Sequence, residues 1–176
     1  MADGLAQIIK HRHTGDDLRN LFLELEMVGE YVAVMNIRFD DKFIVDYDVH
    51  DELVECLVPG LVLQPVVENA LLHGLQNTDG EARLHISGYI EDDAVFLVVF
   101  DNGIGISSEK LNDIQQGLNL EQNLIGHFPE PGLSGVALSN IQRRIRLWFG
   151  NAYGLSIDST PHEGTTVIIR LPIIRE

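Results

Sequence analysis

The sequence predicts a two-layer α+β sandwich rather than a doubly wound parallel sheet. Strand-like segments occur in pairs joined by short turns, as in antiparallel hairpins. Other segments have the three- to four-residue apolar spacing of amphipathic helices, and they stand beside the strand pairs rather than alternating with single strands. With 176 residues, of which 45% are apolar, the chain is long enough to bury one core.

Composition and charge exclude several classes of protein. The chain has 12 Lys and Arg against 27 Asp and Glu, a net charge of −15, whereas nucleic acids and anionic lipids are bound by basic surfaces. Cys56 is the single cysteine, which excludes an internal disulfide and a multi-cysteine metal site. The sequence contains no run of about 18 apolar residues and no signal-peptide pattern at its start. We therefore expect an intracellular domain, or a piece of a larger protein, without a nucleic-acid partner.

The first half of the chain predicts two helices with a strand between them. A long helix is expected from about Asp17 to Ile37, because its apolar residues recur at helical steps. A strand follows at about 43–47, and residues 57–75 contain a second helix that ends at Gly74 and has Pro65 in its first turn. The apolar stripe of this second helix consists of Leu63, Val66, Val67, Ala70 and Leu71.

The second half predicts two hairpins and two helices around a long loop. The loop has no usable period and is rich in Gly, Asn and Pro, and long loops within compact domains are usually functional or mobile. The expected elements are strands over 82–89 and 94–100, a helix over 108–116, the loop over 117–134, a helix over 136–149, and strands over 155–159 and 165–171.

The segment DNGIG, residues 101–105, follows the second strand of the first hairpin. Asp-Asn-Gly is ordinary turn chemistry, so the segment alone is compatible with a simple turn. However, a helix follows it instead of a partner strand, and two glycines one residue apart let the backbone approach a ligand closely. A buried carboxylate at Asp101 needs a partner, and the exocyclic amine of adenine would provide one. Both interpretations stay open.

Glu68, Asn69 and His73 lie on the predicted second helix. Asn69 and His73 are four residues apart and therefore share a face, at the edge of the apolar stripe. An asparagine oxygen is a hard ligand suited to Mg²⁺, which keeps several waters and is also held by substrate phosphates. The alternative is that these are solvated or capping residues of an amphipathic helix.

Two later segments are weak indicators when taken alone. Gly132 and Gly135 precede the helix expected over 136–149, where backbone N–H groups and the helix dipole can meet an anionic oxygen. Three arginines follow within residues 143–146, either as phosphate contacts or as a solvated helix face. The run Gly-Thr-Thr at 164–166 begins the last strand and indicates a turn followed by strand-forming residues.

In this order and spacing, the motifs together resemble the ATP-binding fold of the gyrase, chaperone, histidine kinase and MutL superfamily, the Bergerat-type fold. The stretch LQPVVENALLHGL is similar to the Asn motif of LytS-like sensor histidine kinases, and EMVGEYVAVMNIRFDDKFIVDYDV is similar to the segment that precedes it. The tail GTTVIIRLP also fits, and the resemblance covers about residues 17–174. It implies a mixed, mostly antiparallel sheet covered on one face by helices.

The resemblance implies a role for each candidate residue and names two cofactors, ATP and Mg²⁺. Asn69 would hold Mg²⁺ against the triphosphate, Asp101 would bind the adenine amine, and Gly103 and Gly105 would make room for the base. A flexible ATP lid is expected over about 117–134. The residues expected to complete the ATP site are His73, Gly132, Gly135, Leu138, Arg144 and Thr165.

The implied activity is that of an ATP-dependent protein-histidine kinase, which transfers the γ-phosphate to a histidine nitrogen. Neutral imidazole is already a nucleophile near pH 7, so no strong base is required. Glu68 is the nearby candidate to polarise the attacking imidazole. Pro65 stands where ATP-hydrolysing relatives carry a catalytic Glu, so little ATPase activity is expected.

The family's phospho-acceptor motif is absent from the sequence, which leads us to expect a catalytic fragment of a larger sensor kinase. Residues 1–40 would be the end of a dimerisation region and a linking helix, and residues 41–176 the catalytic ATP-binding domain. The implied partners are a histidine-containing dimerisation domain of the same protein, which is a homodimer at full length, and a cognate response regulator. The domain would be the cytoplasmic part of a membrane-anchored sensor.

Two alternative functions remain. Leu72, Ala137 and Gln142 depart from the family's usual residues, which favours a degenerate nucleotide-sensing or protein-interaction module without phosphotransfer. A serine-directed anti-sigma-factor kinase of the same fold is the other alternative, and the LytS-like stretch before the Asn motif counts against it.

Overall fold

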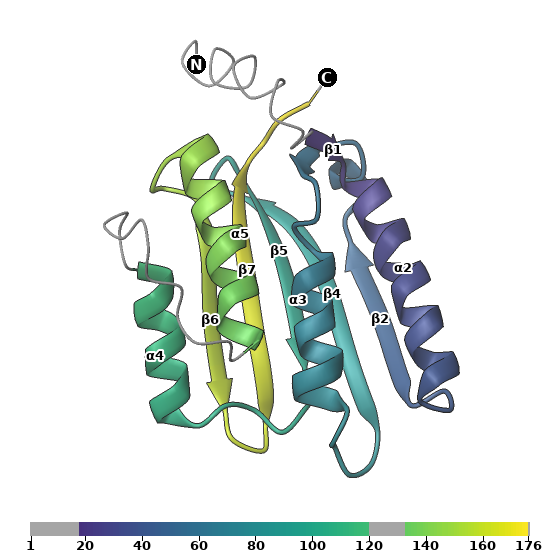
Figure 1. Ribbon diagram of the computed structural model, residues 1–176. Helices are drawn as coiled ribbons and strands as arrows, with labels where there is room; N and C mark the ends of the chain where they lie inside the picture. The colour runs from purple at the N-terminus through teal and green to yellow at the C-terminus, as the bar shows by residue number, and fades with distance from the viewer. Residues whose placement is uncertain (1–17, 120–132, 176) are drawn as a thin grey trace.

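The computed structural model describes residues 18–119 and 133–175 and confirms the predicted sandwich (Figure 1). The larger sheet has five strands in the order β2-β4-β5-β7-β6, and helices cover one face of it (Figure 1). The strands are β2 (Phe43–Val49), β4 (Ala82–Glu91), β5 (Ala94–Asp101), β6 (Gly154–Thr160) and β7 (Gly164–Pro172). The helices are α2 (Leu21–Arg38), α3 (Gln64–Asn69), α4 (Ser108–Asn119) and α5 (Leu133–Phe149).

The sheet is mixed and mostly antiparallel, as expected. Strands β4, β5, β7 and β6 pair antiparallel in that order, whereas β2 pairs parallel with β4. The chain between β2 and β4 contains α3 and crosses the face of the sheet, because parallel neighbours cannot be joined by a tight turn. In this register Asp101 lies between Leu84 on β4 and Thr165 on β7. The last residue of β5 therefore lies at the end of the central strand of the sheet.

The predicted apolar faces of the helices are the ones that the core buries. All five members of the stripe predicted for the second helix are buried, and so are Val28 and Val32 of α2. The inward residues of α5 are Leu138, Ile141, Ile145 and Trp148. Each predicted strand is also found, and each runs slightly longer than the alternation alone indicated.

The predicted start of the first helix at Asp17 is wrong. Residues Leu18–Asn20 form a short strand, β1, that pairs antiparallel with β3 (Leu57–Pro59), and α2 begins only at Leu21. The N–H of Leu21 donates to the carbonyl of Cys56 at 2.9 Å, so a neighbouring segment satisfies the backbone there. Strands of three residues are too short to show a period, which is why the pattern did not predict them.

The second helix continues past the end predicted at Gly74. After α3 the chain keeps turning as a π-helical segment, η2 (Ala70–Leu75). The other two helices reach into the predicted lid: 117–119 belong to α4, and 133–134 belong to α5. The rest of that lid lies outside the described residues.

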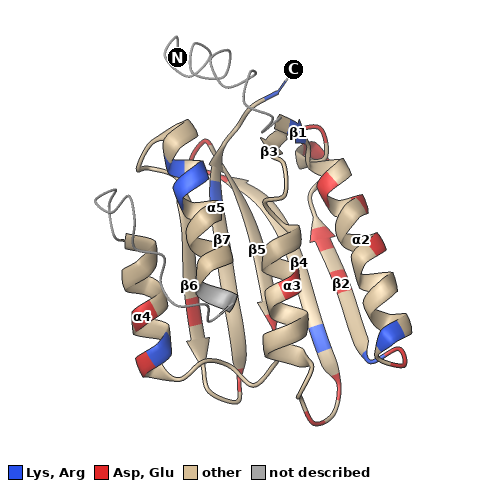
Figure 2. Cartoon of the chain, viewed as in Figure 1, with Lys and Arg blue, Asp and Glu red and all other residues tan. Residues whose placement is uncertain are grey.

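The two ends of the helical layer differ in charge but share one core. Figure 2 shows acidic residues along α2 and β2 and basic residues on α5. Although α2 precedes the predicted domain boundary at residue 40, its buried residues belong to the same core as those of α3, α5 and the sheet. The division of the chain at that boundary stays a prediction.

Among the described residues, no helix has the length and hydropathy that a membrane span requires.

Candidate functional site

A cavity of about 330 Å³ lies between the helical layer and the sheet, near the end of β5. Its walls come from α3, η2, α4, α5 and the strands β5, β6 and β7, with the loop after β5 between them. Most of the wall is apolar, which is the usual composition of a small-molecule site with a few polar groups for orientation. Those polar groups are Asn69, His73, Asn77, Asp101, Ser107, Lys110 and Thr165.

Asp101 is the buried carboxylate of the cavity, with only 3% of its surface exposed. Its Oδ1 accepts a hydrogen bond from the N–H of Gly103 at 2.9 Å. Burial raises its pKa from 3.8 to about 6, and backbone hydrogen bonds from Gly103 and Thr165 oppose part of that rise. Such a group is costly to bury without a partner, so it is suited to accept a hydrogen bond from a ligand.

Three glycines let separate segments close around Asp101. A Cβ on Gly74 would lie 2.5 Å from Oδ1 of Asp101, and a Cβ on Gly103 would collide with the carbonyl of Gly74. Gly105 has a φ of +65° and would collide with the carbonyl of Thr160 if it carried a side chain. The backbone reinforces the contact, since the N–H of Ile104 donates to the carbonyl of Gly74 at 3.0 Å.

Asn69 and His73 both line the cavity, as their four-residue spacing predicts. The amide nitrogen of Asn69 is buried and is one of three such side-chain nitrogens without a hydrogen-bond partner among the described residues. An unpartnered buried amide fits a site that takes a polar ligand. The described residues contain no group of three or more His, Cys, Asp or Glu that could hold a metal by themselves. A single Asn oxygen fits Mg²⁺ that is also held by phosphates and water.

Thr165 is tied into a hydroxyl network at the β6–β7 end of the cavity. Its Oγ1 lies 2.9 Å from Oγ of Ser159, which donates to the carbonyl of Gly164 at 2.7 Å. The same Ser159 oxygen accepts a hydrogen bond from the N–H of Ile106 at 2.9 Å. Ser159 therefore joins the loop after β5 to both strands, a connection that the sequence did not suggest.

Several predicted site residues are placed elsewhere. Glu68 does not line the cavity, and its Oε1 accepts a hydrogen bond from Nε2 of Gln64 at 3.0 Å. Arg144 also lies away from it and donates to the carbonyl of Leu61 at 3.0 Å. Gly135 lies in the first turn of α5, and Leu138 of the same helix lines the cavity. Gly132 lies outside the described residues.

The lining residues that the sequence did not assign to the site include Gly74, Asn77 and Lys110. Gly74 was interpreted only as a helix end, because a pattern does not show which carboxylate a glycine faces. Lys110 is the one Lys or Arg that lines the cavity among the described residues. It lies near the start of α4, a helix to which the sequence assigned no ligand contact.

Comparison with known proteins identifies the class. Residues 59–175 match the family described as "Histidine kinase-, DNA gyrase B-, and HSP90-like ATPase". The chain therefore belongs to this family, and ATP is the cofactor that membership supports.

The similar proteins include two sensor kinases. The "Sensor histidine kinase YesM" of Bacillus subtilis (strain 168) is 29% identical over 177 residues, which cover 100% of this chain and 28% of that protein. The "Sensor protein kinase HptS" of Staphylococcus aureus (strain USA300) is 27% identical over 172 residues, which cover 97% of this chain and 31% of that protein. The chain thus spans less than a third of the length of these relatives.

Solved structures confirm the Bergerat-type fold. The mycobacterial sensor histidine kinase MprB has a TM-score of 0.59 and 17% identity, with 92% of this chain and 99% of that chain covered. The catalytic domain of histidine kinase ThkA has a TM-score of 0.62 and 13% identity, with 93% and 100% covered. At such low identity, these similarities establish the arrangement of helices and strands only.

Proposed function

We propose that this chain is the ATP-binding catalytic domain of a two-component sensor histidine kinase. It would transfer the γ-phosphate of ATP to a histidine on a dimerisation domain. The observation that supports this most directly is the buried carboxylate of Asp101 on the cavity wall, where Gly74 and Gly103 let η2 and the loop after β5 pack closely against it. Family membership and the similarity to sensor kinases agree with it.

The site residues divide between the base and the phosphates. Asp101, held by the N–H of Gly103, would accept a hydrogen bond from the exocyclic amine of adenine, while Gly105 and Thr165 line the surrounding wall. His73 and Leu138 would contact the nucleotide from the helical side. Mg²⁺ bound through Asn69 would offset the negative charge of the phosphates. Lys110 provides an additional cation in the wall of the cavity.

The reaction would be an in-line displacement at phosphorus. An imidazole nitrogen of the acceptor histidine forms a bond to the γ-phosphorus, and the bond from that phosphorus to the β,γ-bridging oxygen breaks, so ADP leaves with the electron pair. The imidazole then releases the proton from its other nitrogen. We propose that Glu68 accepts this proton, which requires its carboxylate to release Gln64.

The full-length protein would contain the parts that this chain does not. We propose that it is a homodimer with a histidine-bearing dimerisation domain, that it passes phosphate to a cognate response regulator, and that this domain lies on the cytoplasmic side of a membrane-anchored sensor. The departures at Leu72, Ala137 and Gln142 support the alternative of a module without phosphotransfer. Gln142 is buried, and its side chain contacts the carbonyl of Leu118 and the N–H of Leu155 instead of the cavity.

Replacing Asn69 by alanine is expected to remove the Mg²⁺ dependence of ATP binding. Calorimetry in Mg²⁺ and in EDTA measures this, and we expect a loss of about one to two decades of affinity in Mg²⁺ only. Asn140→Ala, an exposed asparagine on α5, is the matched control and binds like the parent. Unchanged Mg²⁺ dependence in Asn69→Ala would contradict the metal assignment.

Phosphotransfer separates the kinase from the degenerate module. The chain is incubated with γ-labelled ATP and a separately supplied histidine-bearing dimerisation domain, and label on that domain is measured. We expect acid-labile label on the dimerisation domain, and we expect substitution of Asp101 or Asn69 to prevent it. ATP binding without any transfer, in the presence of a domain that a related kinase can phosphorylate, would favour the degenerate module.

A further inference from the structure

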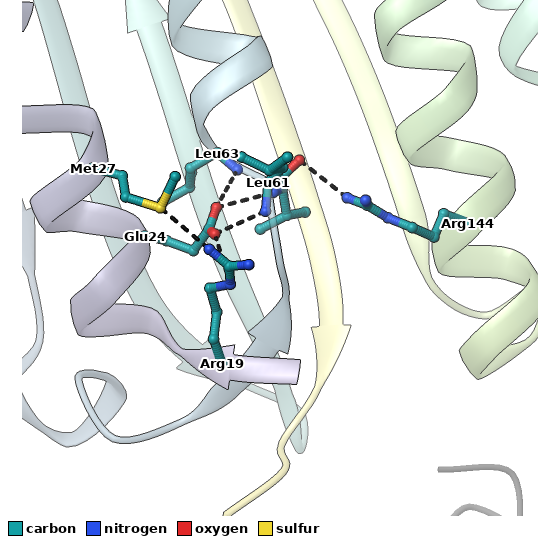
Figure 3. Close-up of polar contacts among 7 residues, drawn as sticks. Arg19, Glu24, Met27, Leu61, Leu63 and Arg144 are labelled. Carbon is teal, nitrogen blue, oxygen red and sulfur yellow. Dashed lines mark hydrogen bonds and ion pairs between the residues drawn. The ribbon is translucent and has the colours of Figure 1, made fainter. Parts of the chain in front are cut away.

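Glu24 on α2 is a buried carboxylate that the proposed reaction does not use. Only 1% of its surface is exposed, and no lining residue of the cavity comes from α2. Its Oε1 accepts a hydrogen bond from the N–H of Leu61 at 2.8 Å, and its Oε2 accepts from Val62 and Leu63 at 3.0 and 3.3 Å (Figure 3). These contacts join segments 37 to 39 residues apart in the chain.

The turn that Glu24 contacts leads directly into α3. Leu61 has a φ of +57°, a left-handed conformation that a leucine rarely adopts. Leu63 is the N-cap residue of α3 and has no side chain able to accept the free N–H groups of the first turn. The carboxylate of Glu24, on a different helix, accepts hydrogen bonds from the N–H of this N-cap residue and of the two residues before it, so it holds the turn that leads into α3.

Two arginines belong to this arrangement, one through Glu24 and one through the turn itself. The Nε of Arg19 lies 3.6 Å from Oε1 of Glu24, and its Nη1 donates to the sulfur of Met27 at 3.2 Å. The carbonyl of Leu61 accepts a hydrogen bond from Arg144 of α5 at 3.0 Å (Figure 3). The peptide groups of one turn thus connect α2, α3 and α5. We call Arg19, Glu24, the turn 61–63 and Arg144 the helix junction.

The helix junction stands at one end of α3, and Asn69 stands at the other. Asn69 follows Leu63 by six positions, which corresponds to about 9 Å along a helix. A short helix transmits a shift of its first turn to its last turn, because its hydrogen bonds keep it rigid. Arg144 connects the same turn to α5, and Leu138 of that helix lines the cavity.

We propose that Glu24 is a positioning residue for the nucleotide site: by holding the turn before α3, it fixes Asn69 where the metal-bound phosphates lie. This inference rests on the proposed function and extends it to a helix that does not touch the cavity. It makes Mg²⁺-dependent binding through Asn69, on α3 itself, more sensitive to the contact between α2 and α3 than binding of the base through Asp101, which stands on β5.

The test measures ATP binding to the full chain in Mg²⁺ and in EDTA by calorimetry. The ratio of the two dissociation constants isolates the Mg²⁺-dependent part, which belongs to Asn69, from the part that belongs to Asp101. In Glu24→Gln we expect this ratio to fall about tenfold, the scale of one charge-assisted hydrogen bond, while binding in EDTA changes less than about twofold. Glu26→Gln, exposed on the same helix, is the matched control and keeps the parent's ratio.

A double variant tests whether Glu24 acts through Asn69. Glu24→Gln combined with Asn69→Ala should lose no more Mg²⁺ dependence than Asn69→Ala alone, because the two side chains act in series. Additive losses would overturn the inference. Equal losses of affinity in Mg²⁺ and in EDTA for Glu24→Gln would also overturn it, since they indicate a general structural role.

Other outcomes are equally decisive. A folded Glu24→Gln protein with the parent's ratio of dissociation constants overturns this inference and leaves the proposed function unaffected. If that variant does not fold, Arg19→Met and Arg144→Met replace it, since each removes an outer contact and leaves the carboxylate in place. Each should lower the ratio about threefold, and unchanged ratios overturn the inference. A parent chain that does not bind ATP in either buffer overturns the proposed function and this inference with it.

Discussion

Asp101→Asn is expected to abolish measurable ATP binding while making the folded chain more stable at pH 7. The amide can no longer offer two anionic oxygens, and its NH₂ group faces the adenine amine with a donor. Loss of a charge-assisted hydrogen bond together with this donor–donor contact corresponds to about two decades in affinity or more. Calorimetric titration with ATP measures this, and binding as tight as the parent's would contradict the nucleotide assignment.

The stability part of this prediction follows from the pKa of Asp101. Burial raises that pKa from 3.8 to about 6, so the folded protein binds the proton more tightly than the unfolded chain. The charged form is therefore destabilising above pH 6, and the parent gains free energy of unfolding as the pH falls from 6 towards 4. A shift of this size corresponds to about 3 kcal/mol at most.

Urea unfolding at pH 5 and pH 7 tests the sign. Asp101→Asn should be more stable than the parent at pH 7, and its advantage should shrink at pH 5, because the parent carboxyl becomes protonated there. Asp158→Asn, at an exposed aspartate on strand β6 of the same sheet, is the matched control and should show no such convergence. An advantage that grows on acidification would contradict the proposed effect of burial on Asp101.

Gly74→Ala is expected to weaken ATP binding by about tenfold or more and to lower the free energy of unfolding by about 1–3 kcal/mol. The new methyl group would lie 2.5 Å from Oδ1 of Asp101, so the carboxylate or η2 must move. A glycine in an unobstructed helix would show the opposite sign, because alanine is the better helix former. The loss therefore reports the contact with Asp101 rather than helix propensity.

Gly29→Ala is the matched control on α2. A Cβ there meets nothing closer than the hydroxyl of Tyr47 at 4.0 Å, so the substitution should stabilise the protein by about 0.5–1 kcal/mol and leave ATP binding unchanged. Both variants are measured by urea unfolding and by calorimetry. If Gly74→Ala behaved like Gly29→Ala, the close approach of η2 to Asp101 would be wrong.

The elements that the sequence predicted well are those with a local cause. The apolar stripe of α3 and η2 is buried because a helical period places those residues on one face, whatever the partner. The hairpin of β4 and β5 follows from alternation and a short acidic turn. Asp101 could be nominated because a carboxylate that ends an apolar strand before two glycines already suggests a close approach to a ligand.

The elements that the sequence missed depend on a partner far along the chain. Strand β1 exists only because β3 pairs with it, and α2 therefore begins at Leu21 and not at Asp17. Glu68 shares a helix with Asn69, yet its carboxylate contacts Gln64 and does not line the cavity. A period indicates that a residue lies on a helix face, but only the neighbouring elements decide what that face meets.

The amino-acid sequence by itself determined the two-layer class, the order of the motifs and the acidic residue at the end of β5 that we propose for the nucleotide site, because spacing and residue chemistry are local properties. Only the tertiary structure decided that Gly74 lies against Asp101, that Arg144 reaches Leu61, and that Glu24 holds the turn before α3. These contacts depend on how helices and strands pack across the sheet, and packing is a property of the whole core, which no single segment encodes.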